Sequence, residues 1–431
     1  MNAGVTVVWE DDTHDDRRFL DRSLRRQADL TVLAEYLAEA PPGPGPGAPS
    51  DWLWPPLADQ EFTLGLRRFV RERVAPEADA IDAEDVYPVR LAKELARAGF
   101  SSVTLPAEYG GGGREFAYAV ALFEEVGAGS AALAVSLITT FQAQTIVRLF
   151  GSDSLKARFL PLFPRGLLAS YALTEAGHGS DIRTLDTKAR RHGDGWVLDG
   201  EKHFITSGSA AEFFVILAET PVGVSAFAVP RDTPGLDVYE GGNSATFGLR
   251  NGPHMNLRLG GVAVPADHLI GTEGKGVRQA VTTLNHSRTL AAAISVGIAR
   301  AAFDTALEYV RERKAFDQTV LSFQGVQWYF ADALADIDAS RLQVFQAGRA
   351  LDAGDDPDRY GSEAKLRAAE VATRTASMAV QVCGAYGTTV QAPFGRFLRD
   401  AKAYEIAGGS TETLRNTIGK YLLRGGKAFS R

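Results

Sequence analysis

The chain has 431 residues, 45% of them hydrophobic, and a formal net charge of -7 at pH 7. That length favours two or three domains with a large buried core. The acidic balance disfavours binding to nucleic acid or to an anionic membrane, since both need a basic face. The longest apolar stretch, AALAVSLITTF at 131–141, is too short to span a bilayer. Cys383 is the only cysteine, which excludes an internal disulfide and a cysteine zinc cluster, so we expect no metal and a cytoplasmic location.

The first 50 residues have a pattern of their own. The segment EDDTHDD at 10–16 lacks the basic and apolar runs of a signal peptide. A leucine stripe from Leu20 to Leu37 favours an appended helical segment, and a mobile tail is the alternative. The segment PPGPGPGAP at 41–49 follows and predicts a linker, because proline and glycine at this density form neither helix nor strand.

Residues 51–166 have a helical pattern. The strings EFTLGLRRFVRERV and RLAKELARAG place apolar residues at three- and four-residue steps. Gly99 closes the second string, as glycine does just past a helix. The glycine-rich EYGGGG at 108–113 has no phosphate-binding lysine after it, so it does not predict a P-loop.

Residues 167–276 have a β pattern. Short β-branched or aromatic runs alternate with glycine, proline and aspartate, as in GWVLDGEKHFIT, EFFVILAE, VSAFAVP and MNLRLGGVAVP. Runs of this length and punctuation are typical of strands joined by turns. We expect a compact β domain, built as a barrel or as paired sheets.

Residues 277–431 return to long helices. Apolar positions recur every three or four residues in two stretches, Val296, Ala299, Phe303, Ala306 and Val310, and then Val326, Phe330, Ala333, Ile337, Ser340 and Val344. A third helix at 361–386 and a fourth near 410–423 complete a four-helix bundle. The predicted fold class is mainly α with a central β domain: an N-terminal helical domain, a middle barrel-like β domain and a C-terminal four-helix bundle.

Six segments, in this order, resemble characteristic segments of the acyl-CoA dehydrogenase flavoprotein family. They are YALTEAGHGSDI (171–182), GWVLDGEKHFITSG (195–208), VAVPADHLIG (262–271), RERKAFDQTVLSFQ (311–324), QVCGAYG (381–387) and RDAK (399–402). The resemblance spans about residues 57–424. It implies the same order of three domains, an oligomer of identical chains, either a dimer or a tetramer, and bound FAD.

The resemblance also implies which residues hold FAD. The isoalloxazine ring would lie against Leu173, Thr174, Phe204, Ile205 and Thr206, with phenylalanine at 204 where the family usually has tryptophan. The pyrophosphate and adenosine would lie against Arg313, Phe316, Gln324, Gln381 and Gly384, some of them contributed across a subunit contact. Ser410 and Glu412 would contact the cofactor from the loop after RDAK. A guanidinium suits two phosphate oxygens, although Arg313 also fits a solvated helix arginine.

The position of the family's catalytic base holds no carboxylate. In the family a glutamate eight residues after the aspartate of RDAK accepts the α proton, and here that position is Gly408. Some relatives carry the base just before an arginine, and here Ser287 precedes Arg288. One explanation is a relocated base, with Glu405 and His286 as candidates. A flavin-dependent monooxygenase or oxidase is the second, and a flavin-binding interaction protein without activity is the third.

Thioester recognition is compatible with this loss. The Gly408 N–H can still donate to an acyl carbonyl, since a backbone donor needs no side chain. The resemblance places Ser180 and Arg288 near the thioester arm. We therefore expect an FAD-dependent oxidoreductase acting on a thioester of coenzyme A or of an acyl carrier protein. An electron-transfer protein or oxygen would reoxidise it.

Overall fold

The computed structural model describes residues 59–242, 245–355 and 357–425. The chain divides into two compact units, residues 1–64 and 65–431. Of the first unit only residues 59–64 are described, and most of them form the start of helix α4 (Gln60–Phe69). The extension and linker predicted at 1–50 lie outside the described residues, so the fold below is that of the second unit.

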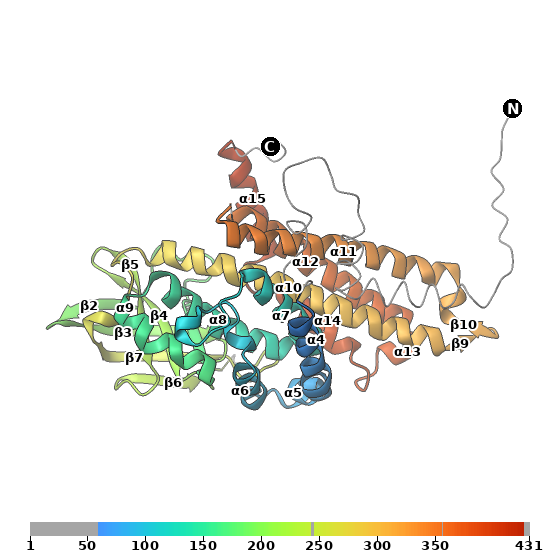
Figure 1. Ribbon diagram of the computed structural model, residues 1–431, viewed down its shortest axis with the longest axis horizontal. Coiled ribbons are helices and arrows are strands. Elements are labelled where there is room, and N and C mark those ends of the chain that lie inside the picture. The colour runs from blue at the N-terminus through green and yellow to red at the C-terminus, as the bar shows by residue number, and fades with distance from the viewer. Residues whose placement is uncertain (1–58, 243–244, 356, 426–431) are drawn as a thin grey trace. The chain divides into compact units, whose positions relative to one another are not determined.

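The second unit begins with helices that pack into a common core (Figure 1). They are α5 (Ala78–Glu84), α6 (Val89–Arg97), α7 (Phe116–Gly129), α8 (Ala131–Phe150) and α9 (Asp153–Phe159). Helix α6 stops just before Gly99, which adopts φ = +84°, a conformation that glycine reaches without strain. The Ser130 hydroxyl caps α8 by accepting a hydrogen bond from the Leu133 N–H at 3.3 Å.

In the described part of the chain, two helices are long and apolar enough to cross a membrane by length and composition alone. They are α8 and α10 (Gly276–Glu312), and 78% of the apolar window of each is buried inside the protein. Burial therefore accounts for their composition, as in core helices of other globular proteins. The prediction that the run at 131–141 is too short to span a bilayer was wrong about length, because this run continues as the 20-residue helix α8.

The middle of the chain forms a curled sheet. Its strands are β1 (Ala169–Ala172), β2 (Lys188–His192), β3 (Gly195–Ile205), β4 (Phe213–Thr220), β5 (Gly223–Pro230), β6 (Leu236–Glu240), β7 (Met255–Val264) and β8 (Leu269–Ile270). The order is β6-β7-β3-β2-β4-β5-β8, and β1 pairs in parallel with β4.

Both faces of β4 are buried, which explains its unbroken apolar sequence. Phe214 and Ile216 point into a core that they share with Trp196 of β3. Val215 and Leu217, on the other face, pack in a second core with residues of α8 and α9. One face of the sheet thus encloses a core of its own, and the other face packs against helices α8 and α9.

The C-terminal part consists of long helices around α12 (Pro357–Val382). Helix α12 contacts α10, α11 (Gln324–Ala353), α14 (Phe394–Tyr404) and α15 (Thr411–Leu423). A small hairpin, β9 (Lys314–Ala315) and β10 (Gln318–Thr319), joins α10 to α11, and the short α13 (Gly384–Gly387) follows α12. The predicted stripes are confirmed, since Phe303, Val310, Ile337 and Val344 are buried.

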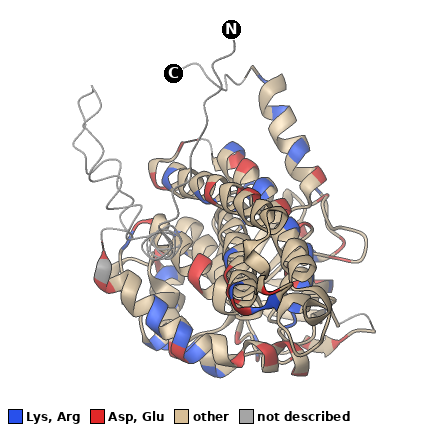
Figure 2. Ribbon diagram, turned by 90° about the vertical axis from the view of Figure 1, so that its right-hand side faces the viewer, with Lys and Arg blue, Asp and Glu red and all other residues tan. Residues whose placement is uncertain are grey.

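The predicted order of a helical domain, a β domain and a helical bundle is confirmed. One helix was missed: α14 carries RDAK, but Pro393 and Gly395 beside its start resemble turn signals in the sequence. Charges of both signs are interspersed over the end of the molecule seen in Figure 2.

Candidate functional site

A buried ion pair fixes the segment that follows β1. The Lys202 ammonium on β3 lies 2.6 Å from a Glu175 carboxylate oxygen, and both side chains are almost completely buried. Lys202 also donates to the Leu173 carbonyl oxygen at 3.2 Å. Burial alone would raise the pKa of Glu175, but the Lys202 ammonium and the N–H of Asp186 and of Thr187 lower that pKa to about 2. The segment 173–175 is therefore locked against β3.

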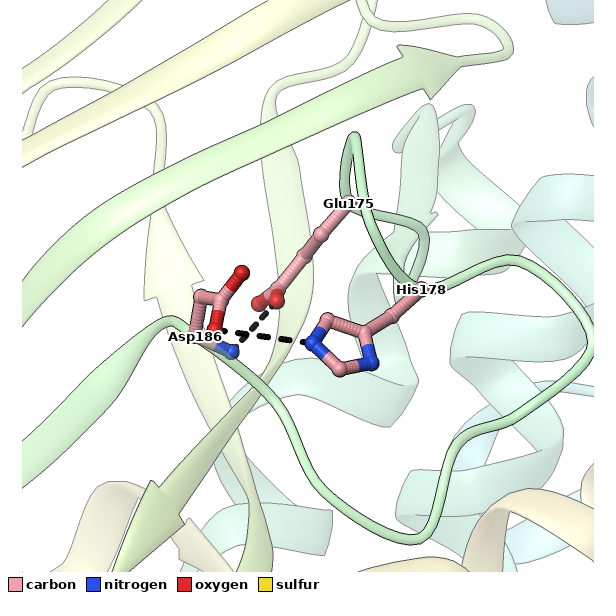
Figure 3. A group of neighbouring side chains, drawn as sticks. All are labelled: Glu175, His178 and Asp186. Carbon is pink, nitrogen blue, oxygen red and sulfur yellow. Dashed lines mark hydrogen bonds and ion pairs between the residues drawn. The ribbon is translucent and has the colours of Figure 1, made fainter.

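Glu175, His178 and Asp186 point toward one another, as Figure 3 shows, and their possible ligand atoms all lie within 4.8 Å of one another. The His178 Nε2 lies 3.5 Å from an Asp186 carboxylate oxygen. Glu175 already binds the Lys202 ammonium and two backbone N–H groups, so its oxygens have little capacity left for an ion. We assign no metal to this cluster; its contacts close the loop 176–186 instead.

The end of β3 beside this locked segment presents one aromatic ring to solvent. The His203 N–H donates to the Thr174 carbonyl oxygen at 2.9 Å, which holds the start of the FIT string beside Thr174. Phe204 is 53% exposed and adopts φ = +55°, an uncommon conformation for an aromatic residue. A strained backbone that displays a large apolar side chain is typical of a ligand site. The next two residues, Ile205 and Thr206, are buried and half-buried respectively.

The sequence-predicted ring residues thus come together: Leu173 and Thr174 on one segment, and Phe204, Ile205 and Thr206 on the next. The Ser170 hydroxyl donates to the Thr206 carbonyl oxygen at 2.6 Å and ties the two segments again. An exposed phenyl ring, a threonine hydroxyl and backbone groups are the kinds of partner that an isoalloxazine ring needs along its face and edge. This set of residues therefore fits a flavin ring.

A second group lies around the loop 405–410, after α14. Gly408 adopts φ = +74° and Gly409 φ = +106°, both in the region that favours glycine. Gly408 is exposed, and a Cβ built on it would lie 3.4 Å from the Ala291 Cβ on α10. The Ser410 hydroxyl caps α15 by accepting from the Thr413 N–H at 3.3 Å. The loop is therefore open at Gly408 and anchored directly after it.

Two cations lie beside this loop, and the sequence motifs pointed to only one of them, Arg288. The Lys365 ammonium on α12 donates to the Gly409 carbonyl oxygen at 2.6 Å, and the residue is fully buried. Burial first, and then the charge of Arg288, lower the pKa of Lys365 to about 7. Arg288 donates from Nη1 to Asn285 Oδ1 at 3.0 Å and to Ser362 Oγ at 3.2 Å.

Helix α8 connects the two groups. The Thr139 hydroxyl donates to the Ser207 hydroxyl at 2.9 Å, directly after the ring segment. One turn further along α8, Gln142 Nε2 donates to the Ser287 hydroxyl at 3.0 Å, next to Arg288. One helical turn rises about 5.4 Å, so the ring residues and the Arg288 end of the loop group flank the same short stretch of α8.

The two candidates for a relocated base lie differently. Glu405 accepts from the Lys402 ammonium at 2.6 Å; burial raises its pKa, but hydrogen bonds from Lys402 and Thr373 bring it below the usual value. His286 donates through Nδ1 to the Thr282 carbonyl oxygen at 2.9 Å, and its ring lies edge-on to Phe116.

Burial lowers the pKa of His286 to about 4, which leaves the ring neutral and only weakly basic. Its contacts are with α7 and with its own helix rather than with the Gly408 loop. Glu405 lies in the same loop region as Gly408, yet it is already engaged by Lys402. Neither contact set places a free carboxylate or imidazole at Gly408.

The residues predicted for pyrophosphate and adenosine lie elsewhere on the chain. Arg313 ends α10, Phe316 lies on the β9–β10 turn at φ = +50° and is 90% exposed, and Gln324 begins α11. Gln381 lies at the end of α12 and Gly384 begins α13. Both lie close by, since Tyr309 on α10 stacks on Tyr386 of α13 with ring centroids 4.8 Å apart. In Figure 1 this hairpin lies at the end of α10 opposite the sheet.

The remaining predicted residues are on the surface. Ser180 is exposed in the loop 176–186, and Glu412 is exposed in the first turn of α15. Hydrogen bonds at that helix start, from its own N–H first, bring the pKa of Glu412 below its usual value. Sequence reasoning missed Glu175, Lys202 and Lys365 as members of the site. For Lys365 a signal was available, since it stands in a helical stripe with the buried Ala364 and Ala368.

Comparison with known proteins gives one consistent result. Three models of acyl-CoA dehydrogenase domains match: the N-terminal domain at residues 58–166, the middle domain at 170–262 and the C-terminal domain at 274–423. A probable acyl-CoA dehydrogenase, FadE25, of Mycobacterium tuberculosis is 33% identical over 377 residues, which cover 86% of this chain and 96% of that protein.

Two solved structures extend the comparison. Butyryl-CoA dehydrogenase from Megasphaera elsdenii has a TM-score of 0.82 at 31% identity, with 85% of this chain and 98% of that chain covered. The prolyl acyl carrier protein oxidase AnaB has a TM-score of 0.80 at 26% identity, with 84% and 98% covered.

Proposed function

Because this chain belongs to the acyl-CoA dehydrogenase family, we propose that it is an FAD-dependent oxidoreductase that acts on an acyl thioester. When bound, FAD supplies the acceptor for a hydride that leaves the acyl chain. The observation that carries the proposal is the exposed Phe204 on a strained backbone, beside Thr174 and tied through α8 to the Arg288 end of the Gly408 loop. An exposed aromatic ring beside Thr174, together with the backbone N–H of Gly408 on the connected loop, suits a thioester held against a flavin.

The chain's own residues have separate tasks in this proposal. Phe204, Thr174 and Thr206 hold the ring, and the Glu175–Lys202 pair keeps their segments in place. The Gly408 N–H orients and polarises the thioester carbonyl, which acidifies the α C–H bond. Arg288 and Ser180 lie where the arm of the carrier would pass. The carrier is coenzyme A or an acyl carrier protein, since both present the same phosphopantetheine thioester.

We propose further that two copies of the chain complete each FAD site. Gly408 lies beside Ala291, whereas Arg313 is 22 residues later on α10, which is roughly 33 Å along a helix. The ribityl chain of FAD is too short to join a ring and a pyrophosphate over that distance. Arg313, Phe316 and Gln324 are all exposed and would therefore serve the ring site of a second copy in a dimer or tetramer.

The proton acceptor is the open part of this function. A dehydrogenation needs a base for the α proton, and neither of the two positions at which the family carries it, here Gly408 and Ser287, supplies one. Glu405 is the better placed of the two relocated candidates. The second candidate function is a flavin-dependent oxidase or oxygenase on the same scaffold. The absence of a carboxylate side chain at Gly408 favours it, and AnaB, which is named an oxidase, shares the fold.

An anaerobic titration separates these functions. The FAD-loaded protein is mixed with a panel of acyl thioesters of coenzyme A and of acyl carrier protein, and the flavin absorbance is followed without oxygen. Bleaching by one thioester supports oxidation of the acyl chain, and rapid reoxidation of the flavin when oxygen is admitted then identifies an oxidase rather than a dehydrogenase. Bleaching only after a reductase supplies electrons, followed by oxygen uptake with the substrate, supports the oxygenase. A protein that binds FAD but responds to neither would contradict a thioester oxidoreductase.

A further inference from the structure

Lys365 is a buried cation with one partner among the described residues. Its ammonium donates to the Gly409 carbonyl oxygen at 2.6 Å, and no ion pair joins it to a described carboxylate. An ammonium has three N–H donors, and burial makes unused donors costly. A lysine in such a position is retained by a fold only when its charge or its single contact contributes something.

Arg288, which is partly buried, is the second cation beside the same loop. Its Nη1 bonds are to neutral oxygens of Asn285 and Ser362, and its Nε is buried without a hydrogen-bond partner. A Cβ built on Gly409 would lie 3.8 Å from that Nε. The guanidinium therefore faces the loop with an unused donor.

The carboxylates nearby are engaged elsewhere. Glu405 accepts from the Lys402 ammonium, Glu412 is exposed at the start of α15, and Asp358 accepts from the Asn285 amide at 2.6 Å. The charges of Glu405 and Glu412 still reach Lys365, and that of Asp358 reaches Arg288. The carboxylate that the family carries at position 408 would add one more negative charge beside these cations, and glycine omits it. Charge in a buried place acts over several ångströms, because little water screens it.

We propose that Lys365 and Arg288 are positioning residues that hold the Gly408–Gly409 loop and stabilise negative charge on a thioester oxygen bound at the Gly408 N–H. The inference rests on the proposed function and deepens it. Removal of an α proton leaves its electron pair shared between the α carbon and the carbonyl oxygen, as an enolate. A positive corner stabilises that enolate, so a weaker acceptor such as Glu405 or water can take the proton.

This role also defines the substrate class. Without a strong base, the reaction favours thioesters whose α C–H bond is already acidic, because a second electron-withdrawing or unsaturated group lies beside the α carbon. The positive corner then adds to an acidity that the substrate brings. An unactivated saturated acyl chain would be a poor substrate.

The test measures ionisation of a bound ligand and needs no turnover. S-acetoacetyl-pantetheine carries the arm shared by coenzyme A and carrier proteins, and it ionises to an enolate that absorbs in the ultraviolet. The FAD-loaded protein is saturated with this ligand, and the enolate absorbance is followed against pH. S-butyl-pantetheine, a thioether without the thioester carbonyl, reports binding of the arm alone.

Lys365→Met and Arg288→Gln should each raise the pKa of the bound ligand by about one, so that the enolate fraction at a pH below that pKa falls about tenfold. Lys365→Gln keeps an N–H donor for Gly409 without the charge, and we expect it to resemble Lys365→Met. Lys420→Met removes an exposed lysine from α15 and is the charge-matched control. Affinity for S-butyl-pantetheine should change less than about twofold in Lys365→Met, Lys365→Gln and Lys420→Met.

The outcomes separate the inference from the function on which it rests. An enolate pKa in Lys365→Met and Arg288→Gln equal to that of the wild type would overturn the inference alone. If Lys365→Gln kept the wild-type enolate pKa while Lys365→Met raised it, the result would exclude a role for the Lys365 charge and leave only its hydrogen bond to Gly409. A wild-type protein that bound neither pantetheine ligand would overturn the proposed function and the inference together. If Lys365→Met failed to fold, Arg288→Gln would decide.

Discussion

Restoring a carboxylate at position 408 tests whether this position faces the α proton of a bound thioester. In Gly408→Glu the new residue must adopt φ near +74°, which costs a residue other than glycine about 1–2 kcal/mol. Its Cβ would make an ordinary contact with the Ala291 Cβ at 3.4 Å, so no backbone has to move. Lys365 and Arg288 lie beside the loop and would offset part of the conformational cost by attracting the new charge.

If the loop still presents position 408 to the substrate, the glutamate becomes a positioned base. General base catalysis contributes about 10²- to 10⁴-fold to a rate, so thioester-dependent flavin reduction should accelerate by that order. The assay is stopped-flow absorbance of the flavin under anaerobic conditions, with the thioester that bleaches the wild type most. Gly408→Gln is the matched control, since it has the same backbone cost and nearly the same volume but no base.

Equal rates for Gly408→Glu and Gly408→Gln would refute the reasoning, because the position would then not face an α proton. A wild type that already reduces its flavin rapidly would refute it in another way. In that case Glu405→Gln should abolish the reaction, and the base would have been relocated within the same loop.

Three other substitutions have defined outcomes. Arg313→Met should weaken FAD binding about 10- to 100-fold, because it removes charge-assisted hydrogen bonds to phosphate; equilibrium titration of the apoprotein with FAD measures this, with exposed Arg68→Met as the control. His286→Gln should change thioester-dependent flavin reduction by less than about twofold, since its ring faces Phe116; a loss of activity with intact FAD binding would contradict this. Burial raises the pKa of Asp400 to about 6, against 3.8 for a free side chain, so the carboxyl costs stability progressively as the pH rises through that interval. The free energy of unfolding of Asp400→Asn minus that of the wild type should therefore increase by about 2–3 kcal/mol from pH 4 to pH 7. Chemical denaturation of both proteins at both pH values measures this difference.

Periodicity predicted most of the fold, because it reports which face of an element is buried. The stripe through Phe303 and Val310 identified α10, and the short punctuated runs identified the sheet. Helix α14 was missed for a physical reason: its eleven residues begin between Pro393 and Gly395, where local preference favours a turn. Packing against α12 and α10 favours the helix instead.

The candidate site divides in the same way. Residues that make a site through their chemical type, such as Arg313 and the Gly408–Gly409 pair, are visible in a string of letters. The Glu175–Lys202 pair is not, because two charged residues 27 positions apart look like ordinary surface groups until the strands bring them to 2.6 Å. A helical register was needed to recognise Lys365, and no single window of sequence shows that its ammonium reaches the Gly409 oxygen.

The loss of the glutamate changes what the rest of the site must do. A carboxylate at 408 would both accept a proton and offset part of the positive charge of Lys365 and Arg288. Glycine removes both effects at once, yet it leaves the backbone N–H that a thioester oxygen needs and adds an open, positively charged corner beside it. Binding and polarisation of the carbonyl are then retained, while the proton acceptor is not. A site that polarises the carbonyl but lacks a proton acceptor needs either a substrate whose α C–H bond is already acidic or a different flavin reaction. The enolate titration distinguishes these two cases, because only the first requires a stabilised enolate.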